Sequence, residues 1–371
     1  MKTKANYLVM AVAALAMAGC SQNEVTDMNP DANPAISFGV YTGTQTRGTE
    51  TTTGSIETQE FGILAYATLD ADWAGSTETP NFMYNQEVTH AASDWTYTPV
   101  KYWPNSSNKI TFFGYAPYST GNGITLSAVS AKGNPTITFA VNDVADKMVD
   151  LVADETQKDK TKDMNGGTVS FKFKHILSRV NLVAKADKDL STGTIIMVTG
   201  VKINKPEGSS PSQTGAKFYK TATYTTNLST GDGKWAAGTP FSADYDLVSL
   251  LNKAAPSPAI DGYTTSGIKV SGTTEASLFK TGQYLFPIPI ESGFAKGDIK
   301  MTISYDVVTT DTNLASKVAV SHETATVDLP ANTLATGTAY KYTFSISTSE
   351  VKVAATVENW AAEQDGGSLN I

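Results

Sequence analysis

The stretch that decides the fold class is Ile299-Lys-Met-Thr-Ile-Ser-Tyr-Asp-Val307, in which apolar and polar residues alternate without interruption. Successive side chains of a β-strand point to opposite faces, so this pattern predicts a strand with one face in a core and one in water. The stretch Val169-Ser-Phe-Lys-Phe-Lys174 alternates in the same way and places its lysines in solvent. Both segments therefore indicate sheet rather than helix.

Similar strand patterns recur along the chain, and segments rich in Gly, Pro, Thr and Ser separate them. The predicted strands are 36–40, 61–66, 96–97, 109–115, 136–141, 169–174, 195–201, 218–226, 299–307, 340–346 and 351–357. Short helical patterns occur only at 143–153 and 246–253. Many strands spaced by turns, with few short helices, predict an all-β protein built from β-sandwiches.

The length of 371 residues exceeds what one hydrophobic core usually serves, so two domains are expected. The stretch KDKTKDMNGG, residues 158–167, has mixed charge and ends in two glycines. Such composition is typical of an exposed segment between domains. We therefore expect an N-terminal sandwich at 36–165 and a C-terminal sandwich at 168–371.

Composition excludes several classes of function. A net charge of −8 and a pI near 5.0 argue against a nucleic-acid partner. The three histidines are His90, His175 and His322, and their separation gives no spacing typical of a metal site. Phosphate-binding loops and nucleophile elbows are absent from the sequence. We expect neither an enzyme nor a cofactor; the alternative left open is a hydrolase whose carboxylate pair is brought together only by the fold.

The segment Trp95-Thr-Tyr-Thr-Pro-Val-Lys-Tyr-Trp-Pro104 is dense in aromatic residues. One interpretation is a platform on which sugar rings stack. The other is that the aromatic rings pack a sandwich core or brace a loop over it, and this second interpretation is favoured.

The N-terminus has the features of an export signal. Lys2 and Lys4 precede the apolar stretch 7–18, which is shorter than the roughly 20 residues that span a bilayer. Met17-Ala18-Gly19-Cys20 resembles the lipobox of bacterial lipoproteins, although Met17 stands where Leu is most common. In such signals the cysteine is lipidated and becomes the mature N-terminus. Residues 1–19 are thus a predicted signal peptide and 20–35 a tether; the other interpretation is an ordinary signal peptide with a chance cysteine.

Several short motifs, taken in order, resemble those of the fimbrillin family of type V pilus subunits, the fimbrillin-like or Mfa-like proteins. They are Trp95, Lys101-Tyr-Trp-Pro104, Ile110-Thr-Phe-Phe-Gly-Tyr-Ala-Pro-Tyr118, Val149-Asp-Leu-Val-Ala153, Phe171-Lys-Phe-Lys-His-Ile-Leu-Ser-Arg-Val-Asn-Leu182, Gly337-Thr-Ala-Tyr-Lys-Tyr-Thr-Phe-Ser-Ile346 and Val357-Glu-Asn-Trp360. Each motif is short, but their order and spacing cover nearly all of the chain.

This resemblance implies two β-sandwich domains of transthyretin-like topology and export as an outer-membrane lipoprotein precursor of a Gram-negative bacterium. It also implies that a trypsin-like protease cuts after an arginine in the loop that follows the first strand. Loss of that strand opens an apolar groove, and a strand from a neighbouring subunit fills it. The resulting fimbrium at the cell surface supports adhesion.

The sequence offers two arginines for such a cut, Arg47 and Arg179. Arg47 and Gly48 lie in the Thr- and Gly-rich loop 42–55, directly after the first strand at 36–41. Arg179 falls in or at the start of a strand, where a protease finds little access. We therefore expect cleavage between Arg47 and Gly48. In the other interpretation Arg47 is a solvated loop charge, and some family members keep their N-terminal segment.

The donor strand is expected within 351–371, where Val351, Val353, Ala355 and Val357 present one apolar face. An ordinary final strand of its own domain is an equally supported interpretation. The leading hypothesis is a structural pilus subunit that joins copies of itself or related subunits head to tail. The alternative is a surface-anchored lipoprotein or pilus-tip adhesin that binds a glycan or host protein. A stalk subunit needs both Arg47 and the C-terminal strand, whereas an anchored binder needs only Cys20 and an exposed site.

Overall fold

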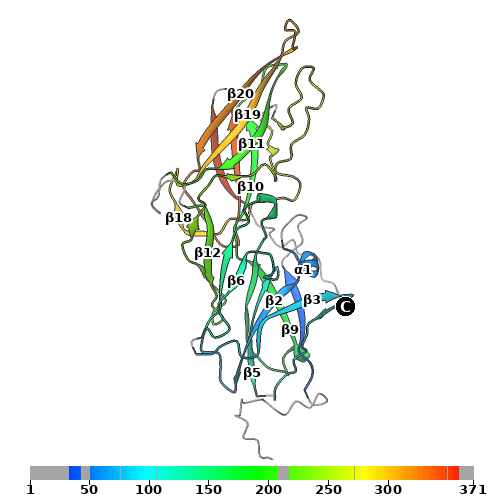
Figure 1. Cartoon of the computed structure of the whole chain (residues 1–371), viewed down its shortest axis with the longest axis vertical. Coiled ribbons are helices and arrows are strands. Elements are labelled where there is room, and N and C mark those ends of the chain that lie inside the picture. Colours follow the sequence, from blue (N-terminus) through cyan, green and yellow to red (C-terminus); the bar gives the residue numbers. More distant parts are fainter. Residues whose placement is uncertain are drawn as a thin grey trace, which may run out of the picture.

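The computed structural model describes residues 33–42, 51–75, 77–105, 107–207, 217–270, 272–348 and 350–358. Strands dominate these ranges, and α1 (Thr53–Gln59) is the one α-helix within them. The molecule is elongated, with β11, β19 and β20 at one end and β2, β3 and β5 at the other (Figure 1). The all-β prediction is confirmed.

A seven-stranded sheet forms one end of the molecule. In spatial order its strands are β1 (Ser37–Thr42), β9 (Thr168–His175), β8 (Val152–Lys160), β5 (Lys109–Ala116), β2 (Phe61–Leu69), β3 (Met83–Ala91) and β4 (Asp94–Thr96). The central strands β2 and β5 are buried on both faces over most of their length, which explains their nearly continuous apolar sequences.

A smaller sheet completes the N-terminal sandwich. It contains β6 (Ile124–Leu126), β7 (Thr136–Ala140), β12 (Tyr219–Thr225), β13 (Lys234–Trp235) and β14 (Thr239–Pro240). Phe113 and Tyr115 of β5 share a core cluster with Ile137 and Phe139 of β7. One face of the large sheet therefore packs in this core, and its other face belongs to a second cluster that includes Phe61 and Phe112.

The C-terminal sandwich pairs two further sheets. The first is β17 (Ala276–Ser277), β10 (Arg179–Ala186), β22 (Ala339–Ile346) and β23 (Val351–Glu358). The second is β15 (Tyr245–Asp246), β11 (Thr194–Ile203), β19 (Lys300–Thr310) and β20 (Val318–Asp328), with β16 (Ile268–Val270) also on β11. A separate ribbon joins β18 (Ile290–Phe294) to β21 (Asn332–Leu334).

The expected domain boundary at 165–168 falls between two strands of one sheet. β9 begins at Thr168 and pairs with both β8 and β1, so residues 168–175 lie with the N-terminal strands. β12 likewise returns to pair with β7. The reason lies in Gly166 and Gly167, whose φ angles of 62° and 84° make a tight turn inside the sheet rather than a linker.

The expected helical pattern at 143–153 is replaced by one turn of 3₁₀ helix, η1 (Ala145–Lys147), followed by β8. Val144 is exposed while Met148 and Leu151 are buried, so these residues do not share one helical face. The segment 246–253 forms turns and short bridges instead of a helix. A second 3₁₀ turn, η2 (Asn165–Gly167), joins β8 to β9.

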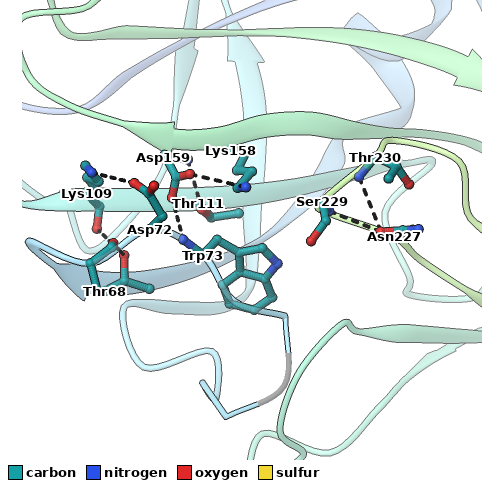
Figure 2. A network of polar contacts seen from close by, with 11 residues as sticks. Thr68, Asp72, Trp73, Lys109, Thr111, Lys158, Asp159, Asn227, Ser229 and Thr230 are labelled. Carbon is teal, nitrogen blue, oxygen red and sulfur yellow. Dashed lines mark hydrogen bonds and ion pairs between the residues drawn. The ribbon is translucent and has the colours of Figure 1, made fainter.

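Polar contacts fix the connection between β2 and β3 on the large sheet (Figure 2). The Lys109 ammonium lies 2.5 Å from Asp72 Oδ1, and the Trp73 N–H donates to Asp159 Oδ1 at 2.7 Å. The Asp159 N–H in turn donates to Thr111 Oγ1 at 3.0 Å. Trp73 is thereby held against Tyr66 in the main core, with ring centroids 4.7 Å apart.

Candidate functional site: the first strand and its groove

β1 is the terminal strand of the seven-stranded sheet and runs parallel to β9. The register pairs Ser37 with Thr168 and ends with Thr42 opposite Phe173. Just before β1, the Ile36 N–H donates to the Lys101 carbonyl at 2.9 Å. Along Ser37–Thr42, the strand pairing found in the described residues is on the β9 side only.

The inward side chains of this segment complete an aromatic core. Ile36 and Phe38 retain only 2% and 6% of their exposure. The ring of Phe38 lies 5.1 Å from that of Tyr97, 5.9 Å from Phe171 and 6.2 Å from Phe112. Removal of β1 would therefore take Phe38 away from these three large aromatic side chains at once.

The aromatic-dense segment 95–104 packs over β1. The Tyr97 hydroxyl donates to the Ile36 carbonyl at 2.9 Å, and Trp103 Nε1 donates to the Gly167 carbonyl at 2.7 Å. Tyr97 and Trp103 are buried, and Trp95 packs edge-on against Phe61. The interpretation of these rings as core packing, rather than as a sugar platform, is confirmed.

The chain is also fixed directly after the expected cleavage loop. The Thr51 N–H donates to Asp150 Oδ2 at 2.8 Å, and the Thr51 hydroxyl donates to the Asp150 carbonyl at 2.5 Å. His175 Nδ1 lies 2.8 Å from the same Oδ2. α1 follows, with Ile56 fully buried, so the expected exposed loop 42–55 ends earlier than predicted. Residues 43–50, including Arg47 and Gly48, lie outside the described residues.

A cavity of about 700 Å³ opens at the end of β1, where Tyr41, Lys172 and Lys174 line it. In the described part of the chain, neither lysine forms an ion pair. The acidic side chains of this cavity already have donors. Asp154 accepts from the Lys172 N–H at 2.7 Å, and Glu155 accepts from Tyr224 Oη.

Burial raises the pKa of the Glu155 carboxyl, because the side chain is removed from water. The Tyr224 hydroxyl and the Asn227 N–H, which both donate to this carboxylate, lower the pKa again in part. Glu155 thus joins β8 to the turn after β12 and lies at one wall of the cavity.

Two of the three histidines lie beside a carboxylate. His175 pairs with Asp150, and His322 Nδ1 lies 2.7 Å from Asp306 Oδ1. Within the described ranges no group of three His, Cys, Asp or Glu side chains could hold a metal ion. Among the same residues, no helix is both long enough and apolar enough to cross a membrane.

Of the two arginines, Arg179 lies among the described residues and Arg47 does not. Arg179 opens β10, is 7% exposed and places its guanidinium 4.5 Å above the Tyr284 ring. The expectation that a protease finds little access to Arg179 is confirmed. Arg47 and the predicted lipidation residue, Cys20, lie outside the described residues.

The candidate donor strand forms β23, the terminal strand of a C-terminal sheet. It pairs antiparallel with β22, from Val351 opposite Ile346 to Glu358 opposite Ala339. Val351, Val353 and Ala355 are half-buried against the main core, whereas Val357 remains 66% exposed. The remaining candidate residues, 359–371, lie outside the described residues.

Sequence reasoning missed two parts of this site. The parallel pairing of β1 with β9 joins segments 131 residues apart, since Ser37 lies opposite Thr168, and no local pattern encodes it. Asp150 looked like one of many acidic residues, and only the fold brings it to Thr51. The two glycines at 166 and 167 were a usable signal for the turn that starts β9.

Comparisons with known proteins agree with this geometry. The fimbrillin-like family model matches residues 46–360. The fimbrium subunit Fim1C of Phocaeicola vulgatus is 41% identical, over 96% of this chain and 97% of that protein. A crystal structure of a fimbrial protein from Bacteroides vulgatus ATCC 8482 is 35% identical, with a TM-score of 0.75 over 88% of this chain and 99% of that one. The chain therefore belongs to the fimbrillin-like family, a family of fimbrial subunits of the cell surface and not of enzymes.

Proposed function

We propose that this fimbrial subunit is exported as a lipoprotein through Cys20, loses β1 by proteolysis after Arg47, and polymerises by donor-strand exchange. The observation that carries the proposal is the position of β1. It is a terminal strand whose buried side chains fill an aromatic groove. The segment that follows it, residues 43–50, contains Arg47.

The energetics of the groove favour strand exchange once the chain is cut. Burying a large apolar side chain contributes about 1.5–3 kcal/mol, and both Ile36 and Phe38 are buried. Loss of β1 removes these contributions and leaves the edge of β9 unpaired. A replacement strand restores the main-chain hydrogen bonds and fills the same pockets. Before the cut β1 occupies the groove as part of the same chain, so no exchange occurs.

Lipid attachment and cleavage are coupled by the order of the chain. The lipid on Cys20 is joined to the fold through the tether 20–35 and then through β1. A trypsin-like protease that cuts between Arg47 and Gly48 separates both tether and β1 from the rest. The subunit then leaves its anchor on the outer membrane at the step that opens its groove. The contacts of Thr51 with Asp150 hold the remaining chain in place.

The donor in this proposal lies within 351–371 of another subunit, a second copy or a related one. Val351, Val353, Ala355 and Val357 give it an alternating apolar face. One subunit's C-terminal segment enters the next subunit's N-terminal groove, so the contact is head to tail and does not close on itself. Repetition of such a contact gives a fibre that supports adhesion.

A second candidate function is a surface-anchored lipoprotein or pilus-tip adhesin for a glycan or host protein. One observation favours it: β23 pairs along its whole length with β22 of its own sheet. A subunit whose β23 stays paired with its own β22 offers no donor strand. It needs only Cys20 for attachment and an exposed surface for its ligand.

Limited proteolysis separates the two functions. Protein that begins at Ser21 is treated with a trypsin-like protease under native conditions, and the new N-terminus and size distribution are measured. A stalk subunit is cut after Arg47 and then forms ladders that resist denaturation. The matched control, Arg47→Gln, stays uncut and monomeric. Wild-type protein that remains uncut at Arg47, or stays monomeric after the cut, would favour the anchored binder or tip.

A further inference from the structure

We propose that the groove binds residues 351–358 of a second copy of this chain in the direction of β1, in one register. Val351, Val353 and Ala355 then take the places of Ile36, Phe38 and Val40, and Glu358 lies beside Lys174. This inference rests on the proposed donor-strand function and adds to it a direction, a register and a charge pair.

The proposed direction is that of the strand being replaced, and free space lies beyond its end. β1 runs parallel to β9, and its last pair is Thr42 with Phe173. Beyond that pair, β9 continues to Lys174 and His175, which line the cavity of about 700 Å³. β1 has six residues and β23 has eight. With Val351 at position 36, a donor that enters in the same direction extends one residue beyond the end of β1, and this residue, Glu358, reaches the side of the cavity lined by Lys174.

The register follows from the size of the pockets. Inward positions recur every second residue, so the apolar face of the donor must match positions 36, 38 and 40. If the donor were shifted so that Val353 lay at position 36, the small Ala355 would fall in the pocket of Phe38. If it were shifted so that Val353 lay at position 40, the polar Ser349 would fall in the pocket of Ile36. The proposed register avoids both mismatches by placing Val353 at Phe38.

The outward face of the donor fits the same register. Ala354 takes the place of Gly39, where an added Cβ would lie 3.4 Å from Ser170 Oγ. An alanine is therefore accommodated there in ordinary van der Waals contact with Ser170. Because position 42 is opposite Phe173, position 43 is opposite Lys174, and Glu358 falls at position 43.

Charge supports the pairing of Glu358 with Lys174. Lys174 has no ion pair in the described part of the chain. The cavity's acidic groups, Asp154, Glu155 and Asp232, accept hydrogen bonds from their own surroundings, and His175 is bound to Asp150. In its own domain Glu358 lies 3.7 Å from Lys341, which has a closer partner at 3.2 Å in Glu275. When it is donated, Glu358 thus loses its long contact with Lys341 and forms an ion pair with the unpaired Lys174.

A charge exchange tests this register. Lys174→Glu and Glu358→Lys are made singly and together in the full chain, cleaved, and compared by the rate at which higher oligomers form at low salt. Each single variant is expected to assemble about threefold to tenfold more slowly, because a partly exposed ion pair becomes a repulsion. The double variant is expected to return to within about twofold of wild type, since an exposed pair contributes little overall. Thermal unfolding of the uncleaved variants verifies that the fold is unchanged.

Lys172→Glu is the matched control, because Lys172 lies on the same face but opposite Thr356 in this register. Rescue of Lys172→Glu by Glu358→Lys would show a register shifted by two residues and would overturn the inference. Unchanged rates in both single variants would also overturn it, while leaving donor-strand exchange intact. Failure of cleaved wild-type protein to assemble at all would instead overturn the proposed function and this inference with it.

Discussion

β1 and β23 are both terminal strands with alternating apolar residues, yet they pair and pack differently. β1 pairs in parallel with β9 and buries Phe38 among aromatic rings. β23 pairs antiparallel with β22, and its apolar side chains remain half-buried or exposed. Loss of β1 therefore opens a core, whereas loss of β23 uncovers only the margin of one. This difference fits the proposed roles, in which β1 is replaced and β23 is donated.

The substitution with the largest expected effect on stability is Phe38→Ala in β1. The ring contacts Tyr97, Phe112 and Phe171, so its deletion leaves a cavity in a packed aromatic cluster. We expect the free energy of unfolding of the uncleaved protein to fall by about 3–5 kcal/mol. Denaturant unfolding measures the change. A loss below about 1 kcal/mol would mean that β1 is loosely bound before cleavage.

Asp150→Ala tests whether the chain after the predicted cleavage loop is independently held. The substitution leaves the buried Thr51 N–H without its acceptor and removes one contact of His175. We expect a loss of about 1–3 kcal/mol and faster hydrogen exchange over residues 51–59. Unchanged exchange there would show that packing of Ile56 alone keeps α1 in place.

Val353→Ala is the matched substitution in β23. Since Val353 is only half-buried, its truncation is expected to cost about 1 kcal/mol in the uncleaved protein, well below the cost of Phe38→Ala. In the cleaved protein the same change should slow assembly, because in the proposed register Val353 takes the place of Phe38 in the next subunit. Equal stability losses for Val353→Ala and Phe38→Ala would remove the distinction between the two strands.

The smallest expected effect is a pH dependence of the free energy of unfolding that comes from Glu155, at the cavity beyond the end of β1. Burial raises the folded-state pKa of Glu155, so between its ordinary value of 4.5 and the raised value the folded state binds more protons than the unfolded state. Stability from this group is present below pH 4.5 and is lost as the pH rises through the folded pKa. Glu155→Gln should remove that part of the pH dependence in urea titrations. An unchanged pH profile would contradict the assignment to Glu155.

The strands of this fold could be predicted from the sequence, but their partners could not. Alternation located β1, β19 and β22 to within a few residues, because a half-buried strand imposes a period of two. The pairing of β1 with β9 depends on contacts between distant segments, which no local pattern records. The same limit hid Asp150, whose role exists only once Thr51 is beside it.

Misassignments have equally physical causes. The mixed charge of 158–167 suggested a linker, yet Lys160 and its neighbours belong to β8, which tolerates polar residues near its end. Val144, Met148 and Leu151 have helical spacing, but tertiary contacts draw Leu151 into the core while Val144 stays in water. Lipidation at Cys20 and cleavage after Arg47 stay predictions from the sequence, because both residues lie outside the described residues.

The central claim is that one strand replaces another, and native mass spectrometry of the cleaved protein measures this most directly. The account predicts that each added subunit in an oligomer is accompanied by loss of one fragment ending at Arg47. Monomers that have not assembled should retain that fragment. Oligomers that keep one fragment for every subunit would contradict the account, because β1 would still occupy the groove.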